Sequence, residues 1–163
     1  MSLDGYIAGP KGEFDWIVQD PDIDFQDLFA QFDVFLVGRR TFELMTKPGS
    51  PPLPAGSKTF VFSRTLETNR PDTEVVREVS PASIARIKAL AKKDIWLFGG
   101  GELFRSLLSQ SLVDSIEVAV SPVLLGAGLQ LLPSPADQAQ LRLTGHRVYG
   151  SGIVLLEYAV AAQ

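Results

Sequence analysis

The sequence contains no cysteine and only one histidine among its 163 residues. Without cysteine the chain can form neither a disulfide framework nor a thiolate metal site. Zinc sites without thiolates usually need several histidines, so a single His146 excludes most of these as well. We therefore expect no bound metal. His146 lies within a predicted strand, and we assign it no role.

An excess of positive charge is also missing. The chain has 15 lysines and arginines against 19 aspartates and glutamates, which gives a formal net charge of -4. Nucleic-acid binding by neutralisation of phosphates requires a basic surface. DNA and RNA are therefore not expected as partners.

Long apolar runs are absent too. No run approaches the roughly 20 apolar residues that a membrane span requires. The opening residues MSLDGYIAGP contain Asp4 and lack the basic region and long apolar stretch of a signal peptide. We expect a cytoplasmic protein without a membrane partner. The segment SLDGYIA reads as the end of a strand and its turn, so this strand is either very short or begins upstream of Met1.

What the chain does have is enough apolar sequence, 45% of its residues, for one sizeable core. This favours a single domain over residues 1–163. Apolar spacing predicts helices that alternate with short continuous apolar strands. Ser80 and Pro81 give the clearest helix start, as a cap and a first-turn proline. The predicted helices are 25–32, 38–45, 80–93 and 100–113, and the predicted strands are 33–38, 58–64, 73–79, 94–99, 115–125 and two in 141–160 around Gly150-Ser151-Gly152.

This alternation predicts a three-layer α/β fold. Continuous apolar strands between helices indicate a mainly parallel sheet with helices on both faces. The last two strands are expected to form an antiparallel hairpin.

Ligands of such folds bind at the carboxyl ends of the strands, where loops lead into helices. Three loops of this kind carry glycine, hydroxyl or arginine: VGRRT (37–41), FSRT (62–65) and FGGGE (98–102). Free backbone N–H groups and guanidinium groups both favour phosphate. The candidate binding residues are Gly38, Arg39, Arg40, Thr41, Ser63, Arg64, Gly99, Gly100, Gly101 and Glu102.

Neither glycine loop matches a standard nucleotide fingerprint. The pattern G-x-G-x-x-G needs glycine where Phe104 stands, and no P-loop pattern occurs. Alone, the glycine triplet is as consistent with a tight turn as with a ligand site, and Arg39 and Arg40 are consistent with a solvated helix start. The co-occurrence of three such loops favours a dinucleotide held by both phosphates, with Arg64 or Arg39 near a 2'-phosphate.

The acidic stretch DPDIDFQD (20–27) has a different explanation. It does not fit a calcium-binding EF-hand loop, because Phe25 stands where glycine is required. Capping of the following helix explains most of it, with Asp22 or Asp24 accepting N–H groups and Asp27 in the first turn. One of these carboxylates remains a candidate proton donor.

Together the segments SLDGYIA, FDVFLVGRRTFE, TFVFSR, WLFGGGELFRSLL and VDSIEVAVSPVLLGAG resemble the dihydrofolate reductase-like superfamily. They are most similar to the branch that includes the reductase domain of the bifunctional riboflavin-biosynthesis deaminase-reductase. The resemblance runs in order from Ser2 to about Tyr158.

The resemblance implies an NADPH-dependent reductase. Residues 38–41 match the family's phosphate-binding helix start, Ser63 and Arg64 match the segment near the 2'-phosphate, and Gly99–Gly101 match the glycine turn against the cofactor. The resemblance also implies a cis peptide bond, which we place at Gly99–Gly100, and a homodimer.

The sequence departs from the family where substrate would bind. Riboflavin-pathway reductases usually read S-L-D-G-K, and this chain has Tyr6 in place of that lysine. Hydride transfer to a heterocycle also needs a proton, for which Asp4, Asp22 and Asp27 are the candidates. The expected substrate is a pteridine, a pyrimidine or a related heterocycle. The alternatives are dihydrofolate reduction and a non-catalytic NADP-binding or regulatory module.

Overall fold

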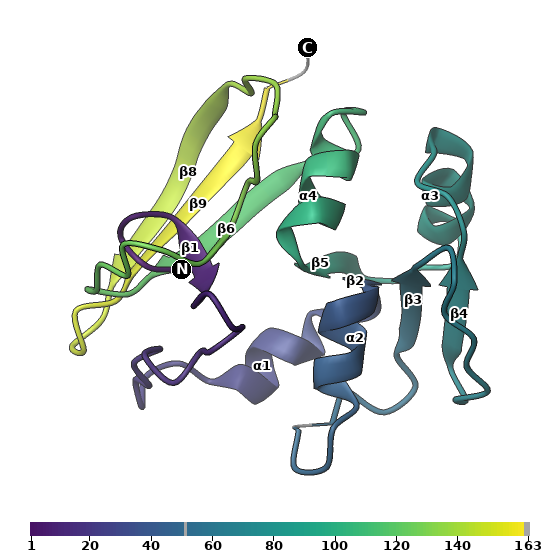
Figure 1. Ribbon diagram of the computed structural model, residues 1–163, viewed down its shortest axis with the longest axis horizontal. Coiled ribbons are helices and arrows are strands. Elements are labelled where there is room, and N and C mark those ends of the chain that lie inside the picture. Colours follow the sequence, from purple (N-terminus) through teal and green to yellow (C-terminus); the bar gives the residue numbers. More distant parts are fainter. Residues whose placement is uncertain (51, 162–163) are drawn as a thin grey trace. The chain divides into compact units, whose positions relative to one another are not determined.

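The structure is a computed structural model that describes residues 1–50 and 52–161 (Figure 1). The chain divides into two compact units, which are described separately below. One unit is continuous and comprises Asp24–Ser106, whereas the other joins Met1–Ile23 to the chain from Leu107 onward. The single domain expected over residues 1–163 stays a prediction.

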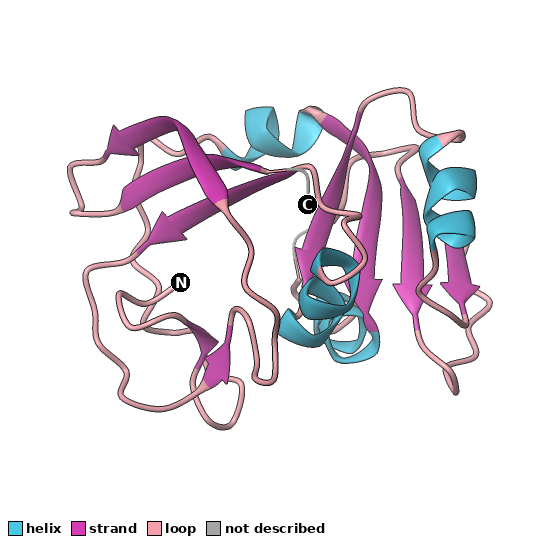
Figure 2. Ribbon diagram, turned by 90° about the horizontal axis from the view of Figure 1, so that it is seen from above, coloured by secondary structure: helices cyan, strands magenta, loops and turns pink. Residues whose placement is uncertain are grey.

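The continuous unit is built on a four-stranded parallel sheet, whose strands lie side by side in Figure 2. The strand order is β4-β3-β2-β5, and all three neighbouring pairs are parallel. Its elements are α1 (Phe25–Ala30), β2 (Phe32–Gly38), α2 (Arg39–Met45), β3 (Lys58–Phe62), β4 (Thr73–Val76), α3 (Pro81–Lys88), β5 (Asp94–Gly99) and the start of α4 (Gly101–Leu108).

The central strands β2 and β3 form the core of this unit because each contains a continuous apolar run, 34–37 in β2 and 60–62 in β3. Val34 to Val37 of β2 are all buried, as the continuous apolar run predicted. Phe42 of α2 packs against Val37 and Val61, which fixes α2 beside β2 and β3. The position of α2 matters for the site because the helix begins directly where β2 ends.

An aromatic cluster joins α1 to the sheet. The ring of Phe29 lies 5.1 Å from that of Trp96 and 6.1 Å from that of Phe35, between centroids. Trp96 also lies 5.3 Å from Phe98 on the same strand. Pairs at these separations stabilise beyond their buried area. The cluster therefore holds α1 against β2 and β5.

Helix α3 begins as predicted but is shorter. The Ser80 hydroxyl accepts from the Ser83 N–H in a reciprocal capping box, and Ile84 and Ile87 are buried. The helix ends at Lys88, whereas the sequence predicted a helix through Lys93. The prediction was wrong there because the backbone N–H groups of residues 92 and 93 donate to the Asp33 carboxylate, not to helical carbonyls.

The second unit contains antiparallel sheets. Strands β6-β9-β8 form one sheet, β1 pairs with β7, and β8 and β9 form the predicted hairpin. The elements are β1 (Tyr6–Ala8), β6 (Ser115–Val120), β7 (Leu129–Gln130), β8 (Leu141–Val148) and β9 (Val154–Val160). With the parallel sheet, these elements give the mixed α/β fold that the sequence predicted.

Two boundaries in this unit differ from the prediction. Strand β6 ends at Val120, five residues before the predicted end, because Pro122 has no N–H for a ladder and the Leu125 N–H donates to Asp4. Residues 2–5 form a turn that leads into β1, so the strand in this segment follows the turn. Before this turn, Ser2 forms an isolated parallel β-bridge with Ser121.

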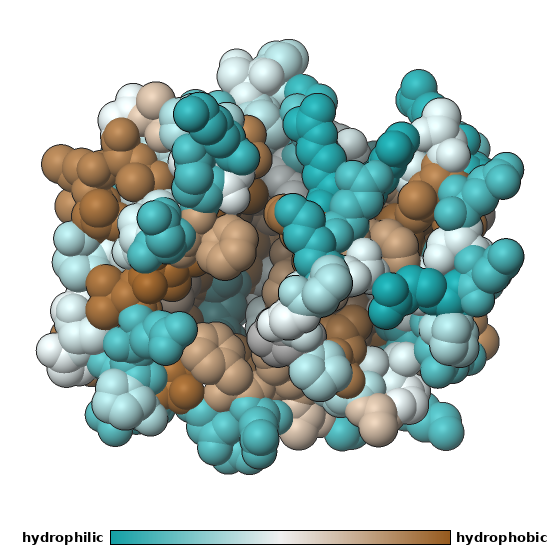
Figure 3. Space-filling view, turned by 60° about the horizontal axis from the view of Figure 1, so that its bottom comes forward, coloured by the Kyte–Doolittle hydropathy of each residue, from teal (hydrophilic) through white to brown (hydrophobic). Residues whose placement is uncertain are grey.

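The surface mixes polar and apolar side chains. Figure 3 shows brown apolar areas interleaved with teal polar ones on the face drawn. The most exposed large apolar side chains are Leu124 at 69%, Val148 at 68% and Leu3 at 65%. In the part of the chain that the structure describes, no helix combines the length and apolar character needed to cross a membrane.

Candidate functional site

The three glycine- and arginine-bearing loops lie at one edge of the parallel sheet. Gly38 at the end of β2 is paired with Phe62 at the end of β3, and Val37 is paired with Gly99 at the end of β5. Because the strands run in the same direction, their carboxyl ends coincide. The structure therefore brings together the residues that the sequence predicted to share a site.

The loops after β2 and β5 approach each other through their backbones. A Cβ atom added at Gly38 would lie 3.6 Å from the Gly100 nitrogen, and one added at Gly100 would lie 3.5 Å from the Thr41 Oγ1. Gly99 has a φ of +120°, a conformation that side chains disfavour. Glycines thus let the two backbones come close, with no side chain of their own between them. The peptide bond between Gly99 and Gly100 is cis, as predicted from the family resemblance.

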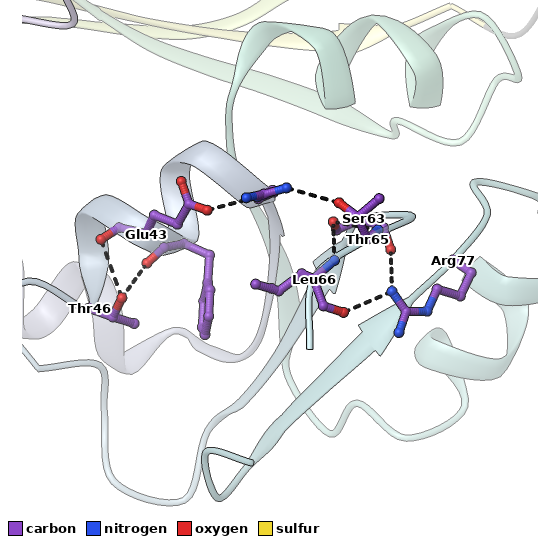
Figure 4. A network of polar contacts seen from close by, with 8 residues as sticks. Glu43, Thr46, Ser63, Thr65, Leu66 and Arg77 are labelled. Atoms are coloured by element: carbon purple, nitrogen blue, oxygen red, sulfur yellow. Dashed lines mark hydrogen bonds and ion pairs between the residues drawn. The ribbon is translucent and has the colours of Figure 1, made fainter. Parts of the chain in front are cut away.

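Arg39 ties the loop after β3 to α2 through Thr65 and Glu43, both labelled in Figure 4. The Arg39 Nη1 donates to the Thr65 Oγ1 at 2.9 Å, and its Nε donates to the Glu43 Oε1 at 2.7 Å. Within the loop, the Ser63 Oγ accepts from the Leu66 N–H at 3.0 Å. Arg39 is therefore partly engaged in holding the loop and is paired with a carboxylate.

A fourth strand contributes to the same edge. Arg77 follows β4 directly, and its Nη1 donates to the carbonyl oxygens of Ser63 at 3.3 Å and Leu66 at 2.8 Å. The sequence analysis missed this residue. The strand predicted over 73–79 placed Arg77 inside the strand, whereas β4 ends at Val76, so an arginine at a strand end could be recognised here only from the structure.

Two further arginines are available for a ligand. Arg40 and Arg64 are exposed, and neither guanidinium group has a hydrogen bond or ion pair within residues 1–50 and 52–161. Glu102, in the first turn of α4, instead pairs with Arg105 at 2.6 Å. Two free guanidinium groups beside uncovered backbone groups form an arrangement suited to a phosphorylated anion.

The family of the chain follows from a comparison with known proteins. The family model described as the RibD C-terminal domain matches residues 1–155. The chain belongs to the RibD C-terminal domain family. This confirms the branch of the dihydrofolate reductase-like superfamily that the sequence motifs resembled.

Individual relatives agree with membership of the RibD C-terminal domain family. The Bacillus subtilis proteins YyaP and YwjB are 32% and 30% identical, over 97% and 95% of this chain and 90% and 91% of theirs. A Shewanella crystal structure named for riboflavin biosynthesis has a TM-score of 0.84 at 23% identity and covers 99% of this chain and 96% of its own.

Two other solved structures have a fold similar to that of this chain. A Thermotoga maritima deaminase and 5-amino-6-(5-phosphoribosylamino)uracil reductase matches with a TM-score of 0.69 and 18% identity, over 98% of this chain and 54% of its own. A dihydrofolate reductase from Enterococcus faecalis, complexed with NADP(H), matches with a TM-score of 0.70 and 18% identity, over 99% and 93%. The dihydrofolate reductase-like fold is therefore shown.

Asp4, a candidate proton donor, has a structural role in this member of the RibD C-terminal domain family. Its carboxylate accepts from the Leu125 N–H at 3.1 Å and the Gly126 N–H at 2.7 Å. The Ser2 hydroxyl, followed by these N–H groups, lowers the pKa of Asp4. A carboxyl that stays ionised is a poor general acid at neutral pH. Its catalytic role stays a prediction that this environment does not favour.

The other acidic residues divide between capping and anchoring. Asp24 caps α1 by accepting from the N–H groups of Gln26 and Asp27, which confirms the capping interpretation. Asp22 and Asp27 are exposed, and their roles as proton donors stay predictions. Asp20 is only 5% exposed and accepts from the Ser151 N–H at 2.8 Å, an anchoring role that the sequence analysis missed.

Tyr6, the departure from the S-L-D-G-K pattern of RibD-type reductases, lies at the start of β1. It is half-buried, pairs with Gln130 of β7, and donates its N–H to the Ser2 hydroxyl. A tyrosine therefore stands where the S-L-D-G-K pattern has its lysine. A substrate contact that depends on positive charge at this position is not available to this chain.

Proposed function

We propose that this chain is an NADPH-dependent reductase that transfers a hydride to a pteridine, a pyrimidine or a related small heterocycle. One observation carries the proposal: the glycine loops after β2 and β5 and the arginine loop after β3 share one sheet edge, with Arg40 and Arg64 unpaired in the described chain. The family activity nearest to this proposal is 5-amino-6-(5-phosphoribosylamino)uracil reduction, which the name of the Thermotoga relative includes.

The residues of this edge fit NADPH. Gly38, Gly99 and Gly100 leave uncovered backbone beside Thr41, which suits a pyrophosphate. Arg64 and Arg40 supply free positive charge for the 2'-phosphate and the pyrophosphate. NADPH, when bound, supplies the hydride. The chain contributes the orientation of the cofactor and a proton donor.

Asp22 and Asp27 are the proposed sources of the proton. Both carry exposed carboxyl groups that would donate in the protonated form, and Asp27 belongs to the same unit as the proposed cofactor loops. A proton donor must come within hydrogen-bond reach of the atom that gains charge as the hydride arrives. Asp4 is the weaker candidate because the N–H groups of Leu125 and Gly126 already hold its carboxylate, and its pKa is lowered.

Cofactor binding is tested by titration with NADPH and NADH, followed through nicotinamide fluorescence. We expect NADPH to bind and NADH to bind more weakly. Absence of binding by either nucleotide at millimolar concentration would refute the proposal.

Catalysis is tested separately by NADPH consumption at 340 nm. The panel comprises the ribosylaminopyrimidine, dihydrofolate and simple carbonyl compounds. We expect turnover with a heterocycle. Binding without turnover of any compound would support a non-catalytic NADP-binding module instead.

We also propose that the protein is a cytoplasmic homodimer. Strand β8 is an edge of its three-stranded sheet, and Leu141, Leu143 and Val148 on it are exposed at 43%, 51% and 68%. An open strand edge with apolar side chains favours association. Sedimentation equilibrium should give twice the chain mass, and a monomer at all concentrations would contradict the homodimer.

A further inference from the structure

We infer that Arg77 is a positioning residue for the NADPH site. It holds the turn formed by residues 63–66 in the shape that presents Arg64 to the 2'-phosphate of the cofactor. The inference rests on the proposed function, because the contact that it supports is a contact with NADPH. Arg77 acts through the turn and is not assigned a contact of its own with the cofactor.

Arg77 closes the turn from the side of β4 (Figure 4). A single nitrogen, Nη1, donates to the carbonyl oxygen of Ser63 at 3.3 Å and to that of Leu66 at 2.8 Å. These two carbonyls stand at the two ends of the turn. One charged group therefore joins both ends, and hydrogen bonds from a charged donor are stronger than those between neutral groups.

The rest of the turn is held independently of Arg77. The Ser63 N–H donates to the Val76 carbonyl at 3.0 Å, and the Ser63 hydroxyl accepts from the Leu66 N–H. Arg39 holds the Thr65 hydroxyl from the opposite side. Of the four side chains in the turn, that of Arg64 is the charged one, and it is exposed without a partner in the described ranges.

Fixing this backbone lowers the entropic cost of binding. A loop that is ordered before the ligand arrives loses less conformational freedom on binding than a mobile loop. The benefit reaches the ligand through Arg64, so it applies to the 2'-phosphate, which NADH lacks. Arg77 should therefore influence the preference for NADPH over NADH more than the binding of the shared part of the cofactor.

The test replaces Arg77 in the full chain and measures dissociation constants for NADPH and NADH. Arg77→Met should weaken NADPH binding about ten-fold, the usual effect of losing charged hydrogen bonds, and should change NADH binding little. Arg77→Lys should restore most of the NADPH affinity, because one nitrogen suffices for both carbonyls. Arg70→Met is the matched control: it removes the same charge from an exposed side chain that has no hydrogen bond in the described chain.

A double substitution separates positioning from direct contact. In an Arg64→Ala background, Arg77→Met should weaken NADPH binding by less than about two-fold, because the residue through which it acts is gone. A full ten-fold loss in both backgrounds would overturn the inference. An unchanged NADPH affinity of Arg77→Met in the wild-type background would also overturn it.

Hydrogen exchange tests the turn without any cofactor. The Leu66 amide, which donates to the Ser63 hydroxyl, should exchange about five-fold faster or more in Arg77→Met, because local opening becomes easier. Unchanged exchange would refute the positioning role. If the wild-type protein binds neither nucleotide, the proposed function fails, and this measurement still decides whether Arg77 orders the turn.

Discussion

At the scale of single residues, Arg64 and Arg39 lie in neighbouring loops but have different contacts. Arg64 is unpaired in the described chain, whereas Arg39 is shared between Glu43 and Thr65. Arg64→Ala should therefore weaken NADPH about ten-fold and NADH hardly at all, since it removes charge-assisted contacts to the 2'-phosphate. Arg39→Ala should also weaken NADPH binding more than NADH binding, but by a smaller factor than Arg64→Ala. Isothermal titration measures both, and equal losses for the two nucleotides would contradict the 2'-phosphate assignment.

Gly38 offers a second test at the residue scale. A methyl group there would make ordinary contact, 3.6 Å, with the Gly100 nitrogen, so the fold should tolerate Gly38→Ala with a change in unfolding free energy within about 1 kcal/mol. The same methyl group covers backbone that is proposed to face the phosphates. NADPH binding should therefore weaken about ten-fold, the equivalent of one good hydrogen bond to a charged group.

Gly150→Ala is the control for this substitution. A Cβ atom at Gly150 has no neighbour within 4 Å, and its φ lies outside the left-handed region. It should alter neither stability nor affinity. Loss of folding in Gly38→Ala, measured by urea denaturation, would show that this glycine is required by packing and not by the ligand.

At the scale of elements, Asp20 links the segment before α1 to the turn of the β8–β9 hairpin. The Ser151 hydroxyl, together with the N–H groups of Asp22 and Ser151, lowers the pKa of Asp20. Its folded pKa therefore lies below the value of about 3.9 for an unfolded aspartate. The stabilisation is present above the unfolded value and is lost as the pH falls through the folded one.

The predicted consequence is a pH-dependent difference between wild type and Asp20→Asn. At pH 7 the variant should have the lower unfolding free energy in urea, and below pH 4 the two curves should converge. The exposed Asp15→Asn serves as the control and should follow wild type throughout. A difference that persists unchanged at low pH would show that the carboxylate charge is not what anchors the hairpin.

The elements also show which features the sequence could reveal. The buried β2 and the capped start of α3 were predictable because one local pattern determines each: an apolar run, and Ser80 followed by Pro81. The ends of α3 and β6 were not predictable, because each depends on a hydrogen bond between residues far apart in the sequence. The Lys92 N–H donates to Asp33, 59 residues away, and the Leu125 N–H donates to Asp4, 121 residues away. Strand β7 is two residues long and has no pattern of its own.

The same distinction applies to the site. The three loops that we propose to bind the cofactor could be singled out in the sequence because each carries its own signal, glycine or arginine, at a strand end. The pairing of Arg39 with Thr65 and the bridge from Arg77 depend on strand order, and a single sequence does not determine that β4 lies beside β3. Likewise, only the structure shows that the Arg64 side chain has no partner among the described residues.

At the scale of the whole molecule, NADPH should stabilise the folded chain. A ligand that binds only the native state at a hundred times its dissociation constant adds about 2.7 kcal/mol to the unfolding free energy. For a chain of this size that corresponds to a rise in Tm of several degrees, measured by differential scanning fluorimetry. NADH at the same concentration should give a smaller rise, and the rise with NADPH should shrink in Arg64→Ala. An equal Tm with and without NADPH would contradict binding.

The division of the chain into units bears on its biosynthesis. The unit of Asp24–Ser106 is one uninterrupted stretch of sequence, whereas the other unit is assembled from both ends of the chain. Ser2 bridges to Ser121 and Tyr6 pairs with Gln130, so the first strand leaves the ribosome more than a hundred residues before its partners do. All strands of the parallel sheet with the proposed cofactor edge are therefore synthesised before the segment from Leu107 onward. The strand partners of the segment before Asp24 are therefore made only after the whole of the parallel sheet.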